Sequence, residues 1–440
     1  MTQVDRRTFL RRSAAVTGGL AVAGPLQAFA ARAALGETVS GVSPFGPLIN
    51  MGDLWLPRGF KYKIISRQGD IMSDGNPTPG IFDGMAAYRV PKFNEGVVLI
   101  RNHENRERAD EIAVQVPPDK IYDPLTVAGN TKVVVSKSLD VVDSYAVLGG
   151  TSTNCAGGQM PWGSWVTCEE VFKDGEQPHG YCFEIPADAT GPVDPIPIKQ
   201  AGRFSHEACV WFDGALYETE DRSVNAALYR YVPDQNVRAA GQLAQSTGVL
   251  QALAVAGSPN YDTRTGQTVG TVLDIEWVDI DEPDPATDTV REEAQSKGAA
   301  PFERQEGMWV GGGRVYFDCT TGGDSGLGQI WEVDPIASTL TLIYESPGEE
   351  ELENPDNIVV TPFGHLFLQE DGPAPQYVRG LTPDGTIYDF CRTETNETEF
   401  AGGCFDPSGR IFFVNQQGDR PTPEAVTYAI TGPWRAARAN

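Results

Sequence analysis

From about residue 50 onward, one pattern returns along the chain: a few apolar residues, a glycine turn, and a strand with alternating apolar side chains. Turns of this kind join the two strands of a β-hairpin. The turn glycines Gly313, Gly364 and Gly409 are 51 and 45 residues apart. This spacing is expected for a β-propeller in which each blade contributes four strands. Five copies of the pattern stand at 210–217, 309–317, 360–367, 381–388 and 405–412.

The predicted fold class is therefore all-β: a β-propeller of about six blades at this period, with loop and short-helix insertions. High contents of glycine (48) and proline (32) without a low-complexity tract favour many tight turns. No linker divides the chain, so we expect one propeller domain at 45–435. Its main insertion covers 274–300, where Asp288 could cap a short helix running through Gln295. A pair of β-sandwiches is the alternative, but it would not require the recurring period.

Residues 1–30 have the three parts of an export signal in order. A basic segment at 5–12 precedes an apolar stretch at 14–30 that ends in an A-x-A cleavage site at 28–30. The twin arginine Arg6-Arg7 indicates the Tat route, so the Tat export machinery is an expected partner in transit. A transmembrane anchor is the weaker alternative, because the apolar run is short and rich in glycine. We expect a periplasmic or secreted protein that no longer contacts the membrane after cleavage.

The chain is strongly acidic, with a net charge of −26 that becomes −29 when the signal, with four arginines and one aspartate, is removed. Such a surface repels nucleic acid and anionic lipid, so neither is an expected partner. Some of the carboxylates could instead neutralise bound cations. A halophilic or merely solubilising surface would have the same composition.

Seven cysteines stand at 155, 168, 182, 209, 319, 391 and 404. Their odd number leaves at least one thiol without a disulfide partner in the chain. The absence of a CxxC pair argues against a zinc ribbon. A small buried apolar residue is the ordinary interpretation of most of them.

Residues 163–172 (GSWVTCEEVF) begin as a strand and then present Cys168, Glu169 and Glu170 side by side. In a propeller, inner strands line a central channel, and groups at their ends point into one pocket. A thiolate and carboxylates gathered there would repel one another unless a cation lay between them. Acids or amides also stand at strand edges at 101–104, 204–207, 217–222, 302–307, 353–357 and 367–372. Each edge alone is typical of a solvated turn, whereas a channel mouth would collect all of them.

These side chains restrict the metal. Numerous carboxylate and amide oxygens suit Ca²⁺, whereas a cysteine thiolate preferentially binds a softer ion such as iron or zinc. With only four histidines, a histidine-rich centre is not expected, and His103 and His206 could act as hydrogen bonders behind the ligands. Arg304 could bind phosphate oxygens through its guanidinium fork, or it could form a salt bridge with Glu306 or Glu303.

The chain resembles the PhoX-type alkaline phosphatases. The phrases that carry the resemblance are GTSTNCAGG at 150–158, PWGSWVTCEE at 161–170, GRFSHE at 202–207, FERQEG at 302–307 and ENPDN at 353–357. They follow the order of the family and extend over most of the chain. The resemblance implies a six-bladed propeller in which iron and calcium ions share one active site that hydrolyses phosphate monoesters.

The resemblance also implies roles for particular residues. Cys168 would bind iron, Glu207 and Glu306 would bind metal ions, and Arg304 would hold the phosphate of a small phosphorylated substrate. The catalytic residues would thus be Arg304, Glu306 and Cys168. Weaker candidates for calcium or iron ligands are Glu169, Glu104, Asp221 and Asp356. Asn154 is a candidate for a phosphate contact.

Two alternatives remain open at the level of sequence. One is a calcium-only lactonase or phosphotriesterase in which Cys168 is a bystander. The other is a non-catalytic exported propeller that binds a ligand at its channel mouth, with calcium as a structural clamp. No G-x-S-x-G elbow is present, which argues against a serine hydrolase.

Overall fold

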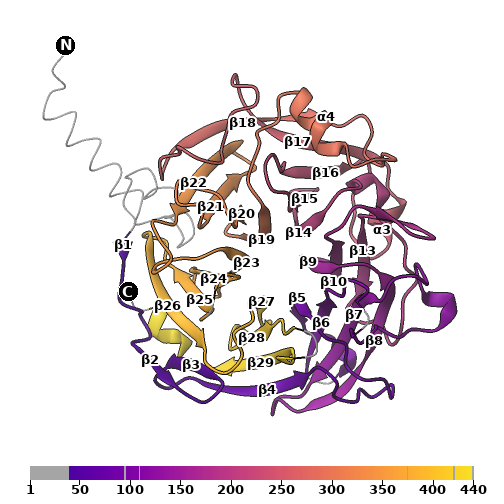
Figure 1. The fold of residues 1–440 in the computed structure, drawn as a ribbon, viewed down its shortest axis with the longest axis vertical. Helices are drawn as coiled ribbons and strands as arrows, with labels where there is room; N and C mark the ends of the chain where they lie inside the picture. The colour runs from indigo at the N-terminus through magenta and orange to yellow at the C-terminus, as the bar shows by residue number, and fades with distance from the viewer. Residues whose placement is uncertain (1–38, 94–95, 109, 374, 420–421, 439–440) are drawn as a thin grey trace, which may run out of the picture.

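Strands make up nearly all of the regular structure in the computed structural model, and they surround one central axis (Figure 1). The structure describes residues 39–93, 96–108, 110–373, 375–419 and 422–438. The predicted export signal at 1–30 lies outside these residues. Within them, no helix combines the length and apolar character that crossing a bilayer requires. The all-β propeller predicted from the recurring hairpin pattern is confirmed.

The strands of the propeller form six groups in the described part of the chain, which we call blades 1 to 6. Blade 1 contains β5 (Phe82–Tyr88), β6 (Val97–His103), β7 (Ala128–Val135) and β8 (Val141–Thr151). Blade 2 contains β9 (Asn154–Met160), β10 (Ser164–Glu169) and β13 (Cys182–Pro186). Blade 3 contains β14 (His206–Phe212), β15 (Ala215–Glu220), β16 (Tyr229–Pro233) and β17 (Gly248–Val255).

Blade 4 contains β19 (Gln305–Gly311), β20 (Arg314–Cys319), β21 (Gln329–Asp334) and β22 (Thr339–Glu345). Blade 5 contains β23 (Pro355–Val360), β24 (Leu366–Glu370), β25 (Tyr377–Leu381) and β26 (Thr386–Thr393). Blade 6 contains β27 (Phe400–Phe405), β28 (Ile411–Gln416), β29 (Val426–Thr431) and β4 (Lys61–Arg67). The strand β18 (Val272–Asp279) pairs with both β17 and β22, so blades 3 and 4 share one sheet.

Short strands and helices are attached to the six blades. The strands β1 (Val39–Ser40), β2 (Leu48–Asn50) and β3 (Leu54–Pro57) extend blade 5 outward, and β11 (Lys173–Asp174) pairs with β12 (Pro178–His179). The described helices are α3 (Gln242–Gln245), α4 (Val290–Ser296) and the 3₁₀ turns η1 (Pro91–Phe93), η2 (Pro118–Lys120), η3 (Lys199–Ala201) and η4 (Trp434–Arg438). The helix expected between Asp288 and Gln295 is therefore present as α4, but Thr289 rather than Asp288 is its N-cap residue.

The two ends of the domain meet in blade 6. The strand β4 pairs antiparallel with β29, from Lys61 opposite Thr431 to Arg67 opposite Val426. The ring is thus closed by backbone hydrogen bonds between segments that lie more than 350 residues apart in the chain. This pairing leaves neither end of the propeller repeat with an open sheet edge at the closure.

Each inner strand carries one extra residue near its start, relative to the strand with which it forms a hairpin. These β-bulges lie at 82–85 in β5, 154–157 in β9, 206–209 in β14, 305–308 in β19, 355–357 in β23 and 401–404 in β27. A bulge bends its strand and changes the direction of the side chains within it. The same distortion is therefore repeated at the same level of all six blades.

Glycine allows these inner strands to approach one another at the axis. A Cβ atom on Gly307 would lie 2.6 Å from the backbone nitrogen of Ile358, and one on Gly84 would lie 2.6 Å from Cα of Ala156. The space left among the central residues is only about 10 Å³. The axis is therefore packed at the level of the bulges and is not an open pore.

We expect Gly307→Ala to lower the free energy of unfolding by about 1–3 kcal/mol, because the added methyl group meets backbone atoms that cannot rotate away. Gly191→Ala is the matched control, since a Cβ atom at Gly191 would have no neighbour within 4 Å. Chemical denaturation of both variants measures the difference. Equal stability of the two variants would contradict the tight packing at the axis.

Candidate metal centre

Five of the six bulges present a side chain of the kind that binds metal ions. These residues are Asp83, Cys155, Glu207, Glu306 and Asp356, each the second residue of its strand. None of them is more than 7% exposed. We call this set the bulge ring. The bulge of the sixth blade contains Gly402 and Gly403 instead, so blade 6 contributes no ligand at this level.

Five more carboxylates surround the bulge ring. Each of them raises the pKa of a ring member, or has its own pKa raised by one, which shows that the two groups lie close together. They are Glu104 after β6, Glu170 after β10, Asp221 after β15, Asp318 in β20 and Glu399 before β27. With the bulge ring they form what we call the channel cluster: nine carboxylates and one thiol.

Burial and like charge together make ionisation of this cluster costly. Burial raises the pKa of Glu207 well above its ordinary value, and the charge of Glu170 raises it further. The same causes, in the same order, act on the pKa of Glu306, where Asp221 is the principal neighbouring charge. Burial also raises the pKa of Asp83 to about 6 and that of Glu104 to about 7. The uncompensated cluster therefore favours protons or other cations.

Several oxygen atoms in the cluster are buried without a hydrogen-bond donor. Both carboxylate oxygens of Glu207 and both of Asp318 lack a partner among the described residues. Buried polar atoms are normally paired, and leaving a carboxylate unpaired is especially costly. Bound cations would satisfy these oxygens, and clustered carboxylates are the ligands that Ca²⁺ prefers. The donor set therefore fits the metal ions that the sequence predicts.

The thiol of the cluster belongs to Cys155. Its sulfur lies 3.6 Å from Oδ2 of Asp83, and its burial raises the pKa of the thiol well above the ordinary value. Ligand atoms of Cys155, Glu170 and Glu207 all lie within 4.8 Å of one another, as do those of Cys155, Asp83 and Glu104. A sulfur ligand beside carboxylates suits a transition metal such as iron better than calcium.

Arg304 is held rigidly at the edge of the cluster. Its Nε and Nη2 donate to the two carboxylate oxygens of Asp221 at 3.0 and 3.1 Å, and Nη2 also donates to Glu306 at 2.7 Å. The residue has a φ of +44°, in the left-handed region that non-glycine residues rarely adopt. The salt bridge to Glu306 that the sequence suggested is present. Nη1 makes no hydrogen bond to the described residues and remains free for a ligand.

A second arginine lies at the mouth of the site. Arg106 forms ion pairs with Glu104 and, at 3.5 Å, with Glu170. A cavity of about 230 Å³ opens beside it and is lined by residues that include Arg108, Asp371 and Glu399. The mouth thus offers guanidinium groups to an anion although the surrounding chain is acidic.

Most of the site residues predicted from the sequence come together here. Glu104, Glu207, Asp221, Glu306, Asp356 and Arg304 all belong to the channel cluster or contact it. Cys168 does not. It lies in β10 within an apolar core that includes Val166 and Phe204, and its sulfur is 3.5 Å from that of Cys182. The thiol among the carboxylates is Cys155, in the neighbouring strand, so the placement of Cys168 in the channel requires correction.

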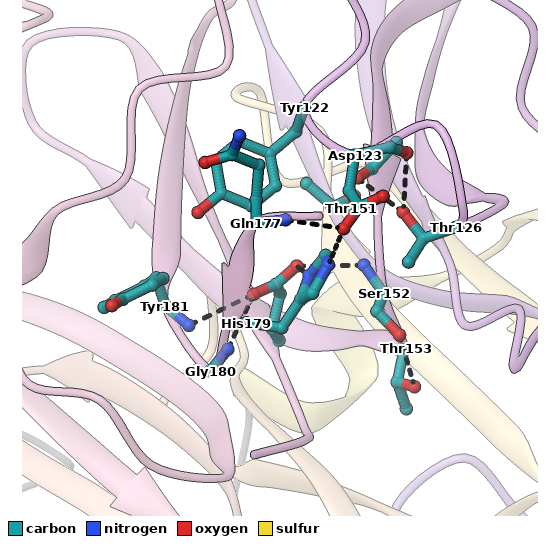
Figure 2. Close-up of polar contacts among 12 residues, drawn as sticks. Tyr122, Asp123, Thr126, Thr151, Ser152, Thr153, Gln177, His179, Gly180 and Tyr181 are labelled. Carbon is teal, nitrogen blue, oxygen red and sulfur yellow. Dashed lines mark hydrogen bonds and ion pairs between the residues drawn. The ribbon is translucent and has the colours of Figure 1, made fainter. Parts of the chain in front are cut away.

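Glu169 also has a different environment from the predicted one. Its carboxylate accepts backbone N–H groups of Ser152, Gly180 and Tyr181 at 2.8–3.2 Å. Figure 2 shows these three residues on either side of His179. Nδ1 of His179 lies 2.7 Å from the same carboxylate. Four hydrogen bonds satisfy both oxygens, so Glu169 anchors the surrounding loops and does not face the channel cluster as a ligand.

Asn154 is likewise occupied within its sheet. Its Nδ2 donates to Oγ1 of Thr167 at 2.9 Å, and its Oδ1 accepts from Oγ1 of Thr151 at 2.5 Å. The side chain is fully buried. Because both ends of the amide have partners, Asn154 supports the strand that carries Cys155 and is not available for the predicted phosphate contact.

Five members of the channel cluster were not among the predicted ligands, although Glu170 was expected to lie at the pocket. Four are carboxylates that lie at or near strand ends, and the fifth is Cys155. The missed residues are Asp83, Cys155, Glu170, Asp318 and Glu399. A local signal could have found Asp83 and Cys155, because both precede a small residue at the start of an inner strand, as Glu207 and Glu306 also do. The small residue faces the packed axis and the preceding residue occupies the bulge.

Comparisons with known proteins find matches in sequence and in fold. The sequence matches the family model for alkaline phosphatase PhoX over residues 43–144 and 137–419. The solved structure of Pseudomonas fluorescens PhoX in complex with vanadate is similar, with a TM-score of 0.66 and 16% identity over 88% of this chain and 97% of that chain. At this identity, the likeness shows the propeller fold.

Weaker matches include a gluconolactonase from Xanthomonas campestris, with a TM-score of 0.46 and 13% identity over 89% of this chain and 99% of that chain. A streptogramin B lyase gives a TM-score of 0.43 and 10% identity over 85% and 98% of the two chains. A search of curated proteins gave no match.

We expect the metal-free protein to lose stability as the pH rises. Asp83 and Glu104 have pKa values of about 6 and about 7 in the fold, above their ordinary values of 3.8 and 4.5. Groups with such raised values stabilise the fold fully below their unfolded pKa, and this contribution is lost as the pH rises through the folded pKa. Between about pH 4 and pH 7, the free energy of unfolding in chelator should fall by at least about 1 kcal/mol.

Thermal unfolding at constant ionic strength measures this effect. Protein loaded with metal ions is the control, because bound cations compensate the carboxylates at every pH in this range and should remove most of the fall. A metal-free protein that becomes more stable from pH 4 to pH 7 would contradict the unpaired state of the cluster.

Proposed function

The chain belongs to the alkaline phosphatase PhoX family, and from this premise we propose that it is a phosphatase that hydrolyses phosphate monoesters with iron and calcium in the channel cluster. The observation that carries the proposal is the meeting of one thiol, nine buried or half-buried carboxylates and the guanidinium of Arg304 at the same end of the propeller. Such a site concentrates positive charge only when metal ions are bound. An anionic phosphate ester would then be attracted to an otherwise acidic protein.

Different parts of the cluster suit different ions. We assign iron to the side that contains Cys155, with Glu170 and Glu207 as its carboxylate neighbours. We assign calcium to the side that contains only oxygen ligands, around Asp318 and Asp356. Bound ions supply Lewis-acid charge to the phosphoryl oxygens and lower the pKa of water to a value useful near neutral pH.

Arg304 has the geometry of a phosphate-binding group. Asp221 and Glu306 hold the guanidinium through Nε and Nη2. The position of Nη1 is therefore fixed before a substrate binds. A donor fixed in advance stabilises developing charge on the transferred phosphoryl group without reorganising during the reaction. The strained backbone at this position has a function under this proposal, because it sets the side chain between Asp221 and Glu306.

The cavity beside Arg106 limits the size of a substrate and offers it donors for an anionic group. Its volume of about 230 Å³ admits a small phosphorylated molecule, and Arg106 and Arg108 stand on its wall. Glu104 orients Arg106 by an ion pair, as Asp221 orients Arg304. The same wall also carries carboxylates such as Glu111, Asp371 and Glu397, so the two arginines offer local donors to an anionic substrate within a lining that is acidic overall.

Replacing Arg304 tests its proposed role. We expect Arg304→Ala to lower kcat/KM for p-nitrophenyl phosphate by about 10²–10³-fold, because a preorganised donor to the transition state is lost. Arg304→Lys should recover part of this loss, since it keeps the charge but not the fork. Steady-state hydrolysis by metal-loaded protein provides the measurement, and orthovanadate, which binds the solved relative, should inhibit the wild type.

Wild-type protein that is fully metal-loaded but inactive toward p-nitrophenyl phosphate would contradict the proposed reaction. Unchanged kcat/KM in Arg304→Ala would instead contradict only the assignment of the phosphate-binding group.

Removing the thiol of the cluster tests the ion assignment. We expect Cys155→Ala to lose bound iron while retaining most of its calcium, because only the sulfur-containing side favours the softer ion. Cys391→Ala is the matched control: Cys391 is equally buried but lies in the apolar core of blade 5. Elemental analysis of proteins purified without chelator gives both metals in one measurement. Calcium without iron in the wild type would favour the calcium-only hydrolase instead.

A further inference from the structure

A second group of metal-ligand side chains lies inside the wall of the propeller, between blades 2 and 3. Cys182 comes from β13, His206 from β14 and Glu218 from β15. One ligand atom from each lies within 4.8 Å of the others, and all three side chains are fully buried. The group is separate from the channel cluster in composition, because it shares no residue with it.

Cys168 adds a fourth side chain to this group. It stands directly opposite Cys182 in the antiparallel pairing of β10 with β13, and the two sulfur atoms are 3.5 Å apart. Cys209 also interacts with Cys168, but its own thiol approaches the carbonyl oxygen of Val166 at 3.9 Å. Apolar residues such as Ile198, Phe204 and Leu216 enclose the group.

His206 is oriented as a ligand. Its Nε2 lies 3.1 Å from the carbonyl oxygen of Gly202, which can only accept a hydrogen bond, so Nε2 carries a proton. In the neutral ring, Nδ1 then has a free lone pair that faces the group. This is the usual arrangement behind a metal-binding histidine, whose other ring nitrogen donates to a carbonyl or carboxylate. Stacking on Phe204, with ring centroids 3.6 Å apart, holds the ring in this direction.

Two buried polar atoms of these residues have no hydrogen-bond partner. They are Nδ1 of His206 and Oε1 of Glu218, both fully buried. Nδ1 of His206 does lie 3.1 Å from Oε2 of Glu218, but not in a direction that makes a hydrogen bond. An ion pair with a protonated His206 ring would engage Nδ1 and Oε2 alone, whereas a bound cation would also compensate the charge beside Oε1.

Three of the six edges of a tetrahedron around one ion can be compared with observed distances, and these three match. The sulfur of Cys168 is not within 4.8 Å of all three other ligand atoms, so its side chain would have to turn toward the ion. Zinc bonds of ~2.3 Å to sulfur and ~2.0–2.1 Å to nitrogen or oxygen predict edges of roughly 3.8 Å for sulfur–sulfur, 3.6 Å for sulfur–oxygen and 3.3 Å for nitrogen–oxygen. The observed distances are 3.5 Å for Cys168–Cys182, 3.9 Å for Cys182–Glu218 and 3.1 Å for His206–Glu218. Each agrees within about 0.3 Å.

We propose that Cys168, Cys182, His206 and Glu218 bind a zinc-type divalent ion in a closed structural site, distinct from the channel cluster. Four protein ligands leave no position for water or substrate, which is the property of structural rather than catalytic zinc. The ligands come from two sheets, β10 and β13 in blade 2 and β14 and β15 in blade 3. The ion therefore ties together two blades that share no backbone hydrogen bonds within a common sheet.

A disulfide between Cys168 and Cys182 is the main rival, because cross-strand partners are close enough to be bridged after a small movement. A disulfide uses only the two sulfur atoms. It would leave Nδ1 of His206 and Oε1 of Glu218 buried without hydrogen-bond partners, whereas one ion could engage all four side chains.

The experiment measures zinc and thiols in the full-length protein purified without chelator from zinc-supplemented medium. We expect about one zinc ion per chain, lost in the double variant Cys168→Ser/Cys182→Ser. The matched double variant Cys391→Ser/Cys404→Ser should keep it, as should Cys155→Ser, which removes the thiol of the channel cluster. Protein denatured in chelator without reductant should show seven free thiols.

X-ray absorption at the zinc edge of the wild type supplies a readout that needs no variant: two sulfur and two nitrogen or oxygen neighbours are expected. The proposal is overturned by five free thiols in the wild type, which would indicate the disulfide. It is also overturned by seven free thiols without bound zinc, by zinc that persists in Cys168→Ser/Cys182→Ser, or by a zinc spectrum without sulfur. None of these outcomes depends on phosphatase activity.

Discussion

One extra backbone residue at the start of each inner strand is the constraint on which the site depends. Six inner strands can meet at the axis only if their contact residues are small, and glycine or alanine meets that need at Gly84, Ala156, Ala208 and Gly307. The bulge places one residue of each strand out of register just before this contact. Its side chain is directed away from the filled axis. Five blades therefore each place one candidate metal ligand at the same height along the axis, and no single loop has to provide all of them.

This concentration of carboxylates has a large electrostatic cost. Like charges held within a few ångströms in a buried place raise one another's pKa values, and Arg304 and Arg106 compensate only at the edge. The buried oxygens of Glu207 and Asp318 lack hydrogen-bond donors. Under the proposed function, cations would be part of the folded state rather than an addition to it. For this reason the strength of ion binding and the stability of the fold should change together.

The sequence predicted the fold and the edges of the site better than its centre. The hairpin period depends on local turn chemistry, and strand-end acids such as Glu104 and Glu306 are visible without knowing which strand is innermost. Cys168 was assigned to the channel because it stands beside two carboxylates at the end of a strand, in a phrase that carries the family resemblance. The structure shows that β9 is the inner strand of blade 2, and its bulge interrupts the alternation at Cys155. Glu169 was misplaced because four hydrogen-bond donors from distant loops converge on it, and no local pattern reveals them.

The thiols of Cys155 and Cys168 lie in different surroundings, and these surroundings suit different metal ions. Cys155 lies among hard oxygen ligands at the channel, whereas Cys168 lies with Cys182 and a histidine in a dry apolar wall. Calcium has no affinity for the second environment, and a zinc-type ion gains most from it. Grouping two thiols and a histidine away from the carboxylate-rich channel would let the two sites favour different ions while the protein folds. His206 and Glu207 are consecutive in β14, so an ion on His206 would also fix the strand that presents Glu207 to the channel.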